Sequence, residues 1–379
     1  MNASSPGTGD RGRLLVVSHP CVVAVNQAVY VELSRLGWNT LLVVPKRWRH
    51  EYAPDAFGPK PLEGMEDRLL PVRIVLPGRP QRHVYLTRPA KVIGQFRPDV
   101  AFLEEESFSV PAYQWGRSLV RARVSFGVQA DENLDRPLPW VAKRIRREVL
   151  AHVDFVAARS PRAAELARRW GAKGLVSIVP HAVPGWERQP RPNARVNGDF
   201  TVGFAGRLTP EKGVDDLVRA GRLLGGRTRL LFVGDGPLRR DLESAATPDC
   251  SIEVRTGVAH EQMPEAYADM DVLVLPSRTT ERWAEQFGRV LVEALSCGVP
   301  VVGSDSGEIP WVVRETGGGR LYREGDAAGL AEVLGQLRDD PVQTEEFARR
   351  GREAVQRLFS VEAAAASLDT ALRGAGNGR

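Results

Sequence analysis

Short apolar runs alternate with amphipathic stretches along the first 180 residues, and this alternation predicts a parallel sheet covered by helices. The runs have the length of buried strands and end at polar or turn-forming residues. They include residues 14–18, 39–44, 98–104 and 123–129. The last run stops at Pro180. Because parallel strands need long crossover connections, the pattern indicates a doubly wound α/β domain over residues 1–180.

The alternation restarts after a segment without an apolar period. Residues 181–199 are rich in Pro, Asn and Arg, which favours a linker. A second alternation runs over residues 200–357, and a further helical stretch ends the chain over residues 358–379. The sequence therefore predicts an α/β protein in which two doubly wound domains follow one another and face a central cleft.

Two carboxylates bracket the start of a predicted helix in the second domain. Glu285 is expected at the N-terminal edge of this helix and Glu293 two turns deeper, which at about 1.5 Å per residue separates them by roughly 12 Å. That distance is close to the span from sugar to ribose in a nucleotide sugar. The helix N-terminus between them offers free amides and a positive dipole end, which suit a diphosphate.

A second polar cluster follows the first strand of this domain. The strand ends at Gly206, the following turn carries Arg207 and Lys212, and Pro210 stands near the start of the next helix. Two cations beside a strand-to-helix turn can neutralise a pair of phosphates without a metal ion. The alternative is that Arg207 pairs with a carboxylate and Lys212 is only solvated.

The motifs of the C-terminal half occur in a characteristic order. They are residues 204–213, 233–237, 275–277, the pair Glu285 and Glu293, and residues 297–310. In this order and spacing they resemble a retaining glycosyltransferase of the GT-B fold, family 4 (glycosyl transferases group 1). The resemblance implies two Rossmann-like domains, with the acceptor on the N-terminal side and a nucleoside-diphosphate sugar on the C-terminal side. It also implies a final helix that packs back on the N-terminal domain.

The resemblance assigns roles to individual residues. Arg207 and Lys212 would hold the donor diphosphate and stabilise the leaving group, and Glu285 would contact the donor sugar, so these three form the predicted catalytic set. Glu293 would bind the ribose, residues 257–263 would line the nucleobase pocket, and backbone amides near residue 307 would approach the phosphate. The implied donor-binding residues are Gly206, Gly234, Gly236, Val258, Met263, Phe287, Gly288, Glu293, Ser306, Gly307, Glu308 and Ile309.

The acceptor or donor-sugar side of the N-terminal domain departs from the family pattern. Asn26 and Gln27 stand where a Gly-rich loop is common, and Gln129 stands where the resemblance implies a histidine. Asp131 follows Gln129 closely and would accept hydrogen bonds from sugar hydroxyls, or would be an ordinary surface turn residue. His19 ends the first strand and would contact phosphate or acceptor, or would cap the following helix.

Charge divides unevenly between the domains. Residues 1–180 hold 27 Lys plus Arg and 17 Asp plus Glu, a net charge of +10, and the rest of the chain carries −5. A basic N-terminal domain favours an anionic acceptor, a membrane surface or electrostatic capture of a nucleotide. Residues 138–150 read as a basic amphipathic helix that lies on anionic lipid, or as a solvated helix with its apolar side in the core.

No run approaches the roughly 20 apolar residues of a membrane span, and the polar start is not a signal peptide. The protein is therefore expected in the cytoplasm, with peripheral contact at the inner face of the membrane as the open alternative. Expected partners are the donor, a small-molecule, glycan or lipid-linked acceptor, and no nucleic acid.

Candidate metal ligands and cysteines are weighed separately. Asp269 and Asp271 have the spacing of a metal-binding motif, but Asp271 directly precedes a buried run, so the pair is expected to end a helix and begin a strand. Residues 104–106 are three consecutive glutamates without a second ligand cluster in the sequence. The three scattered cysteines predict neither a disulfide framework nor a zinc site. No metal and no cofactor is expected.

The predicted reaction is sugar transfer to a hydroxyl group. In the family that the chain resembles, retention is explained by attack on the same face, with the leaving phosphate taking the acceptor proton, so no enzymic nucleophile is needed. The alternatives are a catalytically silent GT-B protein that binds a sugar nucleotide or polysaccharide, a nucleotide-sugar 2-epimerase, and a phosphorylase. A dinucleotide oxidoreductase is disfavoured because no GxGxxG follows the first strand.

Overall fold

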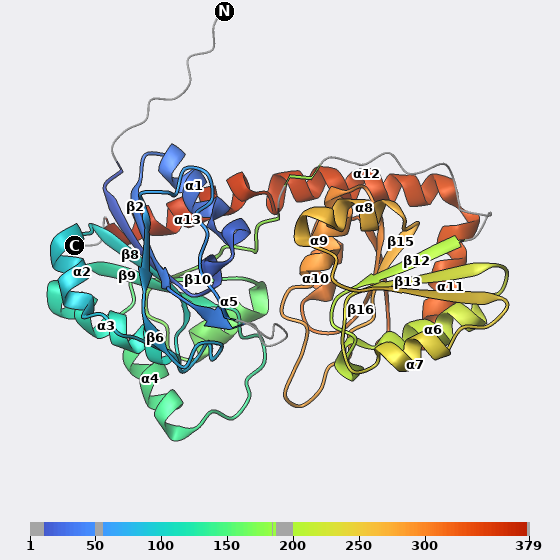
Figure 1. Cartoon of the computed structure of the whole chain (residues 1–379), viewed down its shortest axis with the longest axis horizontal. Helices are drawn as coiled ribbons and strands as arrows, with labels where there is room; N and C mark the ends of the chain where they lie inside the picture. The colour runs from blue at the N-terminus through green and yellow to red at the C-terminus, as the bar shows by residue number, and fades with distance from the viewer. Residues whose placement is uncertain (1–10, 50–55, 184, 187–199, 377–379) are drawn as a thin grey trace, which may run out of the picture. The chain divides into compact units, whose positions relative to one another are not determined.

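The computed structural model describes residues 11–49, 56–183, 185–186 and 200–376, which form two compact units (Figure 1). Unit 1 comprises residues 1–182 and 361–379, and unit 2 comprises residues 183–360. Most of the predicted linker 181–199 lies outside the described residues.

The described part of unit 1 is built on a parallel sheet of seven strands in the order β11-β10-β9-β8-β1-β2-β5. Nearly every residue of its central strands is buried, as expected for a sheet that is covered on both faces. The strands are β1 (Arg13–Ser18), β2 (Asn39–Pro45), β5 (Leu69–Val72), β8 (Val100–Glu106), β9 (Ser125–Ala130), β10 (Phe155–Ala158) and β11 (Leu175–Ile178). Two short antiparallel pairs join β3 (Trp48–Arg49) to β4 (Ala56–Phe57) and β6 (Ile74–Val75) to β7 (Val84–Tyr85).

Helices cover the sheet of unit 1, and two of them start at serine caps. Ser109 and Ser160 each accept the backbone N–H three residues later and begin α3 and α5. The helices are α1 (Ala28–Arg35), α2 (Pro89–Phe96), α3 (Val110–Ala122), α4 (Trp140–Leu150), α5 (Pro161–Arg169) and α13 (Val361–Gly376), with 3₁₀ turns at Pro20–Val22 and Ala24–Gln27.

The C-terminal helix α13 packs within unit 1, against α1 and β10. Leu368 and Leu372 are buried in the same cluster as Tyr30. The indole N–H of Trp38 donates to Asp369 at 2.8 Å. Helix α13 therefore completes a core that also contains side chains of β1 and β2.

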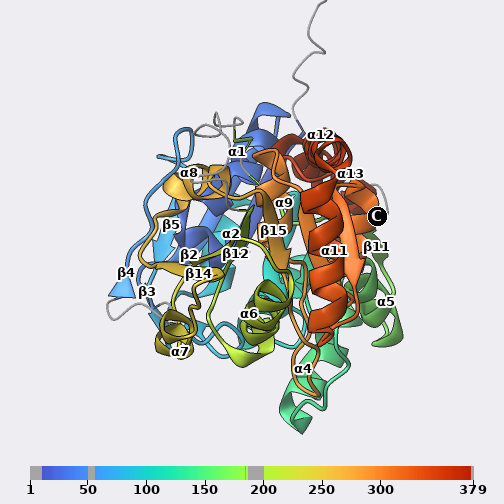
Figure 2. The same cartoon turned by 90° about the vertical axis from the view of Figure 1, so that its right-hand side faces the viewer.

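The described part of unit 2 contains a parallel sheet of six strands in the order β14-β13-β12-β15-β16-β17. The strands are β12 (Phe200–Ala205), β13 (Thr228–Val233), β14 (Cys250–Arg255), β15 (Val272–Leu275), β16 (Val301–Ser304) and β17 (Gly319–Tyr322). Figure 2 shows α11 beside α6 on one face of this sheet. The helices are α6 (Val214–Leu223), α7 (Arg239–Ser244), α8 (Met263–Ala268), α9 (Arg289–Ser296), α10 (Ile309–Thr316), α11 (Ala327–Asp339) and α12 (Pro341–Leu358), with 3₁₀ turns at Pro210–Lys212 and His260–Gln262.

Each sheet reverses its strand order once. In unit 1 the chain leaves β1 toward β2 on one side and returns to β8 on the other, and in unit 2 the reversal lies between β12 and β15. Doubly wound sheets bind ligands outside the carboxyl ends of the strands at such a reversal. The fold thus points to the loops after β1 and β8 in unit 1 and after β12 and β15 in unit 2.

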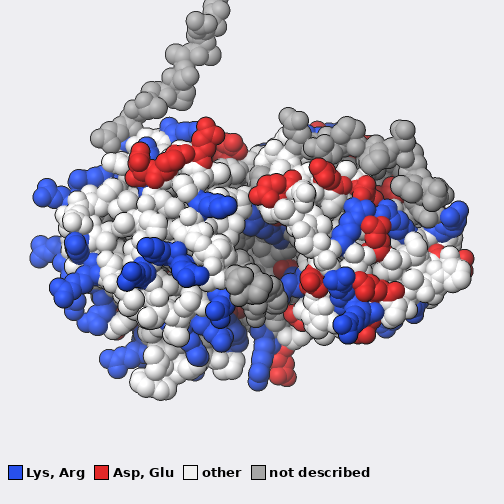
Figure 3. All heavy atoms as spheres, viewed as in Figure 1, with Lys and Arg blue, Asp and Glu red and all other residues white. Residues whose placement is uncertain are grey.

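The surface of unit 1 is basic, as its composition requires, and Figure 3 shows Lys and Arg side chains spread over its visible face. Helix α4 contributes to this surface. Its C-terminal residues Val149 and Leu150 are buried, whereas Trp140 is 73% exposed. The expected core-facing apolar side therefore exists but does not include Trp140. Among the described helices, none has the length and apolar character to cross a membrane.

Candidate functional site

Glycines bring the loops after β12 and β13 into direct contact. A Cβ atom on Gly234 would lie 1.9 Å from the carbonyl oxygen of Gly206, and one on Gly236 would lie 2.5 Å from the carbonyl oxygen of Leu208. Gly234 also has a φ of 150°. The Gly206 N–H donates to Val233 at 2.9 Å. The backbones can approach this closely because these positions have no side chain.

Lys212 and Glu285, which the sequence predicts as part of one site, form a direct ion pair. The Lys212 Nζ atom lies 2.6 Å from a carboxylate oxygen of Glu285, and the Ser277 hydroxyl donates to the same oxygen at 2.8 Å. The Lys212 ammonium also lies 4.9 Å from the ring centre of Trp283. Only 14% of the Lys212 side chain and 10% of the Glu285 side chain are exposed. The alternative that Lys212 is merely solvated is therefore wrong.

Arg207 lies in the same loop after β12 as Lys212. A terminal nitrogen of its guanidinium is 3.5 Å from a carboxylate oxygen of Glu211, and 37% of its side chain is exposed. The arginine does contact a carboxylate, as the alternative interpretation held. The side chain is thus partly exposed in this loop, and a guanidinium is a fork of donors that suits a phosphate.

Glu293 lies inside α9, whereas Glu285 precedes that helix. Gly288 takes a left-handed conformation, with a φ of 76°, and α9 begins at Arg289. The prediction that both carboxylates belong to one helical run is therefore wrong, because the chain is extended or turned before the glycine. The rough 12 Å spacing derived from helical rise does not apply to this pair.

Three side chains lie close to the buried Glu293 carboxylate, and one of them donates a hydrogen bond to it. The Tyr267 hydroxyl donates to it at 2.8 Å, the Arg289 Nε atom lies at 3.1 Å and the His260 Nε2 atom at 3.5 Å. Burial, together with the negative charge of Glu293, raises the pKa of Tyr267 well above its ordinary value. Trp186 packs on His260, with ring centres 5.0 Å apart.

The predicted nucleobase residues flank the turn that carries His260. Val258 and Met263 are both half-buried and stand on either side of the 3₁₀ turn that carries His260. They pack against the core of unit 2. The segment after β14 therefore brings apolar side chains and a histidine to the end of the sheet where Glu293 lies.

The turn after β16 is tied to the Glu285 loop. A Cβ atom on Gly307 would lie 2.1 Å from the Glu285 carbonyl oxygen, and the Glu308 N–H donates to that oxygen at 2.9 Å. The Ile309 N–H donates to Ser306 at 3.2 Å, and the Ser306 hydroxyl pairs with Thr279 at 2.9 Å. The amides of residues 308 and 309, predicted to face the donor, are therefore engaged within the protein.

Two predicted donor residues have side chains in the core. The Phe287 ring packs against Trp311 and Phe359, with centre distances of 5.9 and 5.6 Å. Ile309 is fully buried. Both side chains are part of the core of unit 2, so any donor contact at these two positions would come from the backbone.

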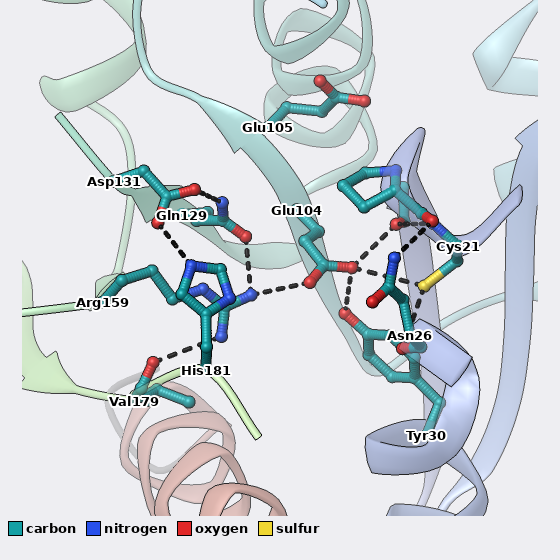
Figure 4. Close-up of polar contacts among 12 residues, drawn as sticks. Cys21, Asn26, Tyr30, Glu104, Glu105, Gln129, Asp131, Arg159, Val179 and His181 are labelled. Carbon is teal, nitrogen blue, oxygen red and sulfur yellow. Dashed lines mark hydrogen bonds and ion pairs between the residues drawn. The ribbon is translucent and has the colours of Figure 1, made fainter. Parts of the chain in front are cut away.

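In unit 1, a buried ion pair joins the carboxyl ends of β8 and β10 (Figure 4). Arg159 lies 2.6 Å from one oxygen of Glu104, and Ser18 and Tyr30 each donate to the other oxygen at 2.7 Å. Arg159 also donates to the Val179 carbonyl at 3.2 Å. Both charged groups thus have partners beyond each other, which lowers the cost of burying the pair.

Gln129 extends this network toward Asp131 and His181. The Gln129 side-chain oxygen accepts from Arg159 at 2.7 Å, and its amide nitrogen donates to Asp131. The His181 Nε2 atom lies 3.2 Å from the other Asp131 oxygen. Burial alone would raise the pKa of Asp131. The favourable electrostatic interactions of its carboxylate with His181 and Arg159 outweigh burial and hold the pKa below its ordinary value. A histidine from a different segment thus stands near Gln129, where the family resemblance implied one.

The side chains of residues 104–106 alternate across β8, so that Glu105 points away from Glu104 (Figure 4). The His19 Nδ1 atom lies 2.9 Å from Glu105, so His19 makes no cap to the following turn. Glu106 accepts the N–H groups of Asp131 and Glu132 at 2.7 and 2.9 Å. Burial, with the charge of Asp131 added, raises the pKa of Glu106 to about 8.

The two amides predicted for the acceptor side support the local backbone. Gln27 is fully buried, donates to the carbonyls of Cys21 and Lys60, and accepts the Leu62 N–H. Asn26 donates to Pro20 at 2.8 Å. The prediction that Gln27 contacts a ligand is therefore wrong, because its buried side chain joins two loops by hydrogen bonds.

The remaining candidates have structural contacts. Asp269 pairs with Arg255 at 2.6 Å, and Asp271 accepts the Thr201 N–H at 2.8 Å, at the end of α8 and the start of β15 as expected. All three cysteines are buried and free. Burial raises the pKa of Cys297 to about 11, so its thiol stays protonated.

Several side-chain partners at the candidate sites lie far apart in the sequence. Glu104 and Arg159 stand 55 positions apart, and Tyr267 and Glu293 stand 26 apart, so no local motif links them. The signal that was available is positional. A residue that follows a buried parallel strand, such as Arg159 in unit 1 or Ser277 in unit 2, is expected at the carboxyl-end edge of its own sheet.

Comparison with known proteins agrees with this arrangement. Residues 199–340 match the family model described as glycosyl transferases group 1. The chain is 27% identical to D-inositol 3-phosphate glycosyltransferase of Nocardia farcinica, over 89% of this chain and 79% of that protein. It is 30% identical to 2-deoxystreptamine glucosyltransferase of Streptomyces kanamyceticus, over 62% of this chain and 63% of that protein.

Solved structures share the fold. The sucrose-phosphate synthase of Thermosynechococcus elongatus superimposes with a TM-score of 0.70 at 18% identity, covering 96% of this chain and 98% of that one. HepE of Anabaena, solved in complex with UDP, gives a TM-score of 0.69 at 18% identity, covering 96% and 99%. With two Rossmann-like parallel sheets, the fold is GT-B. The chain thus contains a glycosyl transferases group 1 domain at residues 199–340 and is a homologue of glycosyltransferases.

Proposed function

We propose that the protein transfers a sugar from a nucleoside-diphosphate sugar to a hydroxyl acceptor, with retention of anomeric configuration. The observation that carries the proposal is the ion pair of Lys212 and Glu285, which joins the loops after β12 and β15 at the reversal of strand order in unit 2. Lys212 and Arg207 in one loop suit the diphosphate of such a donor, and the adjoining carboxylate of Glu285 suits the hydroxyls of its sugar.

The donor binds across three groups of unit 2. Lys212 and Arg207 take the diphosphate, Glu285 accepts hydrogen bonds from sugar hydroxyls, and Glu293 accepts them from the ribose. Glu293 is already held by Tyr267 and Arg289, so ribose binding requires either a shared oxygen or a shift of the Tyr267 hydroxyl. Of the predicted segment after β16, Ser306 and Gly307 remain candidates to approach the phosphate.

The reaction follows from charge placement. As the anomeric bond breaks, positive charge develops on the sugar and negative charge on the departing phosphate. Preorganised Lys212 and Arg207 stabilise the leaving group, and removal of one such donor typically costs about 10²–10³ in kcat. The acceptor attacks the face that the phosphate leaves, and the phosphate oxygen takes its proton. Glu285 orients the sugar and forms no covalent bond to it.

The two cations make a divalent ion on the donor unnecessary, and we propose that none is used there. Both positive groups sit in one loop, where an ion would otherwise neutralise the phosphates. The proposed acceptors are a small molecule, a glycan or a lipid-linked hydroxyl. The basic surface of unit 1 favours an acceptor that carries negative charge.

The experiment that tests the function is product analysis with a panel of nucleoside-diphosphate sugars in excess EDTA. Release of the nucleoside diphosphate, and an NMR coupling constant at the new anomeric carbon equal in type to that of the donor, support retaining transfer. Arg207→Ala and Lys212→Ala should both lose sugar transfer. Arg239→Ala, which removes an exposed ion pair with Glu243, should retain it. Binding without any turnover would favour a silent protein, and isomerised donor would favour an epimerase.

A second proposal concerns contact between helix α4 and a membrane surface. We propose that α4 contacts an anionic bilayer through Trp140 and Val141, both exposed, while Lys143, Arg144 and Arg147 lie exposed on the same helix. Aromatic and basic residues together suit the interface of such a bilayer. In sedimentation with anionic vesicles, the wild-type protein should pellet with the vesicles, and a larger fraction of Trp140→Ala should stay in the supernatant. Equal sedimentation of both would contradict this contact.

A further inference from the structure

We propose that His19, His83 and Glu105 form a binding site for one divalent transition-metal ion, with zinc as the simplest occupant. The three residues lie in different segments of unit 1: the turn after β1, the residue before β7, and the end of β8. Their candidate ligand atoms all lie within 4.8 Å of one another. Two imidazoles and one carboxylate are a ligand set that suits such ions.

The distances from Glu105 to the two imidazoles are close to those between the ligand atoms of a metal site. The His19 Nδ1 atom lies 2.9 Å from one oxygen of Glu105, and the His83 Nε2 atom lies 3.5 Å from the other. Ligand atoms that each bind an ion at about 2.0–2.2 Å stand roughly 3 to 4 Å from one another. The carboxylate therefore already spans the gap between the two imidazoles.

The tautomer of His83 supplies an independent argument for a cation. The His83 Nδ1 atom lies 3.0 Å from the Pro80 carbonyl oxygen and 3.3 Å from that of Arg79, and a carbonyl only accepts, so Nδ1 carries the proton. In the neutral ring, Nε2 then presents a lone pair toward the Glu105 oxygen. Two such electron-rich atoms repel one another unless a proton or a metal ion lies between them.

No hydrogen bond satisfies that nitrogen among the described residues. The His83 Nε2 atom is buried without a hydrogen-bond partner there, and His83 is 0% exposed. An unpaired buried nitrogen is costly, which favours a bound ion that would use it. The contact from Nδ1 to a backbone carbonyl is also the arrangement by which metal-binding histidines are usually oriented.

Burial of the three ligands defines the kind of site. Glu105 is 1% exposed, whereas 19% of the His19 side chain is exposed. The Trp48 ring packs on both imidazoles, 5.0 Å from His19 and 5.2 Å from His83. Three protein ligands with one partly exposed side leave a coordination position for water or another ligand.

The site differs from the proposed donor contacts. All three ligands belong to unit 1, whereas Lys212, Arg207 and Glu285 belong to unit 2, so the proposed metal-free binding of the diphosphate is unaffected. A bound ion would tie the turn after β1 to the end of β8. It would thereby fix the loop beside the reversal of strand order in unit 1. The ligand residues act by positioning this loop.

The test is a titration of the tag-free, metal-stripped protein with Co²⁺, followed by visible d–d absorption, and with Zn²⁺, followed by metal analysis after gel filtration. We expect one ion per chain in the wild type. His83→Gln and Glu105→Gln should each lower the apparent affinity by at least 10-fold, in line with the loss of a ligand. His152→Gln, which changes an exposed histidine outside the cluster, should bind as the wild type does.

A thermal unfolding series separates metal binding from folding. Zn²⁺ should raise the unfolding midpoint of the wild type and of His152→Gln, and raise that of the ligand variants less at the same Zn²⁺ concentration. His19→Gln, which alters the partly exposed ligand, serves if the buried variants do not fold. Absence of stoichiometric binding in the wild type, or unchanged binding in all three ligand variants, would overturn the proposal and leave the cluster as a protonated ion pair.

Discussion

At the residue scale, the candidate sites contain charged side chains whose partners are distant in the sequence. Lys212 and Glu285 are 73 positions apart and touch, and Glu104 and Arg159 are 55 apart and touch. The two pairs are about equally buried, with 14% and 10% of the Lys212 and Glu285 side chains exposed and 9% and 10% of those of Arg159 and Glu104. They differ in their further partners: Glu104 also accepts from Ser18 and Tyr30, and Arg159 also donates to Gln129 and to the Val179 carbonyl. This denser set of bonds suits a structural role for the second pair.

Lys212→Ala should lower kcat/KM for sugar transfer by about 10²–10³, because a positive group that meets developing phosphate charge is removed. Steady-state kinetics with saturating acceptor measures it. Arg239→Ala, on the surface of the same unit, is the matched control and should change kcat/KM less than twofold. A Lys212→Ala variant with wild-type kinetics would contradict the assignment of this lysine to the leaving group.

Glu104→Gln should lower the free energy of unfolding by about 3 kcal/mol, because Arg159 is left with a buried charge and a neutral partner. Urea unfolding, followed by circular dichroism, measures the change. Glu243→Gln breaks an exposed pair and should cost at most about 0.5 kcal/mol. Similar losses in the two variants would show that the buried pair contributes no more than the surface one.

At the element scale, the strands were predictable from sequence and the turns between them were not. Buried apolar runs identified β1, β2, β8 and β9 within a few residues, because parallel strands that are covered on both faces are apolar throughout. The start of α9 was placed too early, since the sequence does not reveal that Gly288 takes a left-handed conformation. The sequence likewise does not reveal that Gly307 is left-handed or that the Glu308 N–H donates to the Glu285 carbonyl.

Gly234→Ala should impair donor binding at least tenfold and lower stability, because its new Cβ would lie 1.9 Å from the Gly206 carbonyl oxygen. The loop that carries Arg207 would have to move. Gly94→Ala, in the open interior of α2 with nothing within 4 Å, should be stabilising by about 1 kcal/mol. Nucleotide titration and urea unfolding measure the two effects, and unaltered donor affinity in Gly234→Ala would contradict the role of this close approach.

At the scale of the whole molecule, unit 1 is built from two separate parts of the sequence. Helix α13 ends the chain but belongs to unit 1, where Leu372 is fully buried. The candidate residues of each unit gather at the carboxyl ends of the strands beside its reversal, which the alternation of strands and helices could predict. The side-chain partners there, such as His83 with Glu105, could not be predicted, because their contact depends on how the loops fold over the sheet.

Leu372→Ala should destabilise unit 1 by roughly 2–5 kcal/mol, because it opens a cavity between α13 and the sheet. Two-probe urea unfolding, with a readout for each unit, measures it. Leu223→Ala, which changes a leucine that is 62% exposed on α6, should have little effect. If Leu372→Ala unfolds like the wild type, α13 does not contribute to the core as described.

The central claim is that unit 2 holds the nucleotide of a sugar donor through Arg207 and Glu293. Isothermal titration of the full chain with UDP, GDP, ADP and dTDP in EDTA tests it most directly. The account predicts saturable binding of one nucleotide, weakened at least tenfold in both Arg207→Ala and Glu293→Ala and retained in Arg239→Ala. Absence of binding by every nucleotide at millimolar concentration, or equal affinity in all variants, would contradict it.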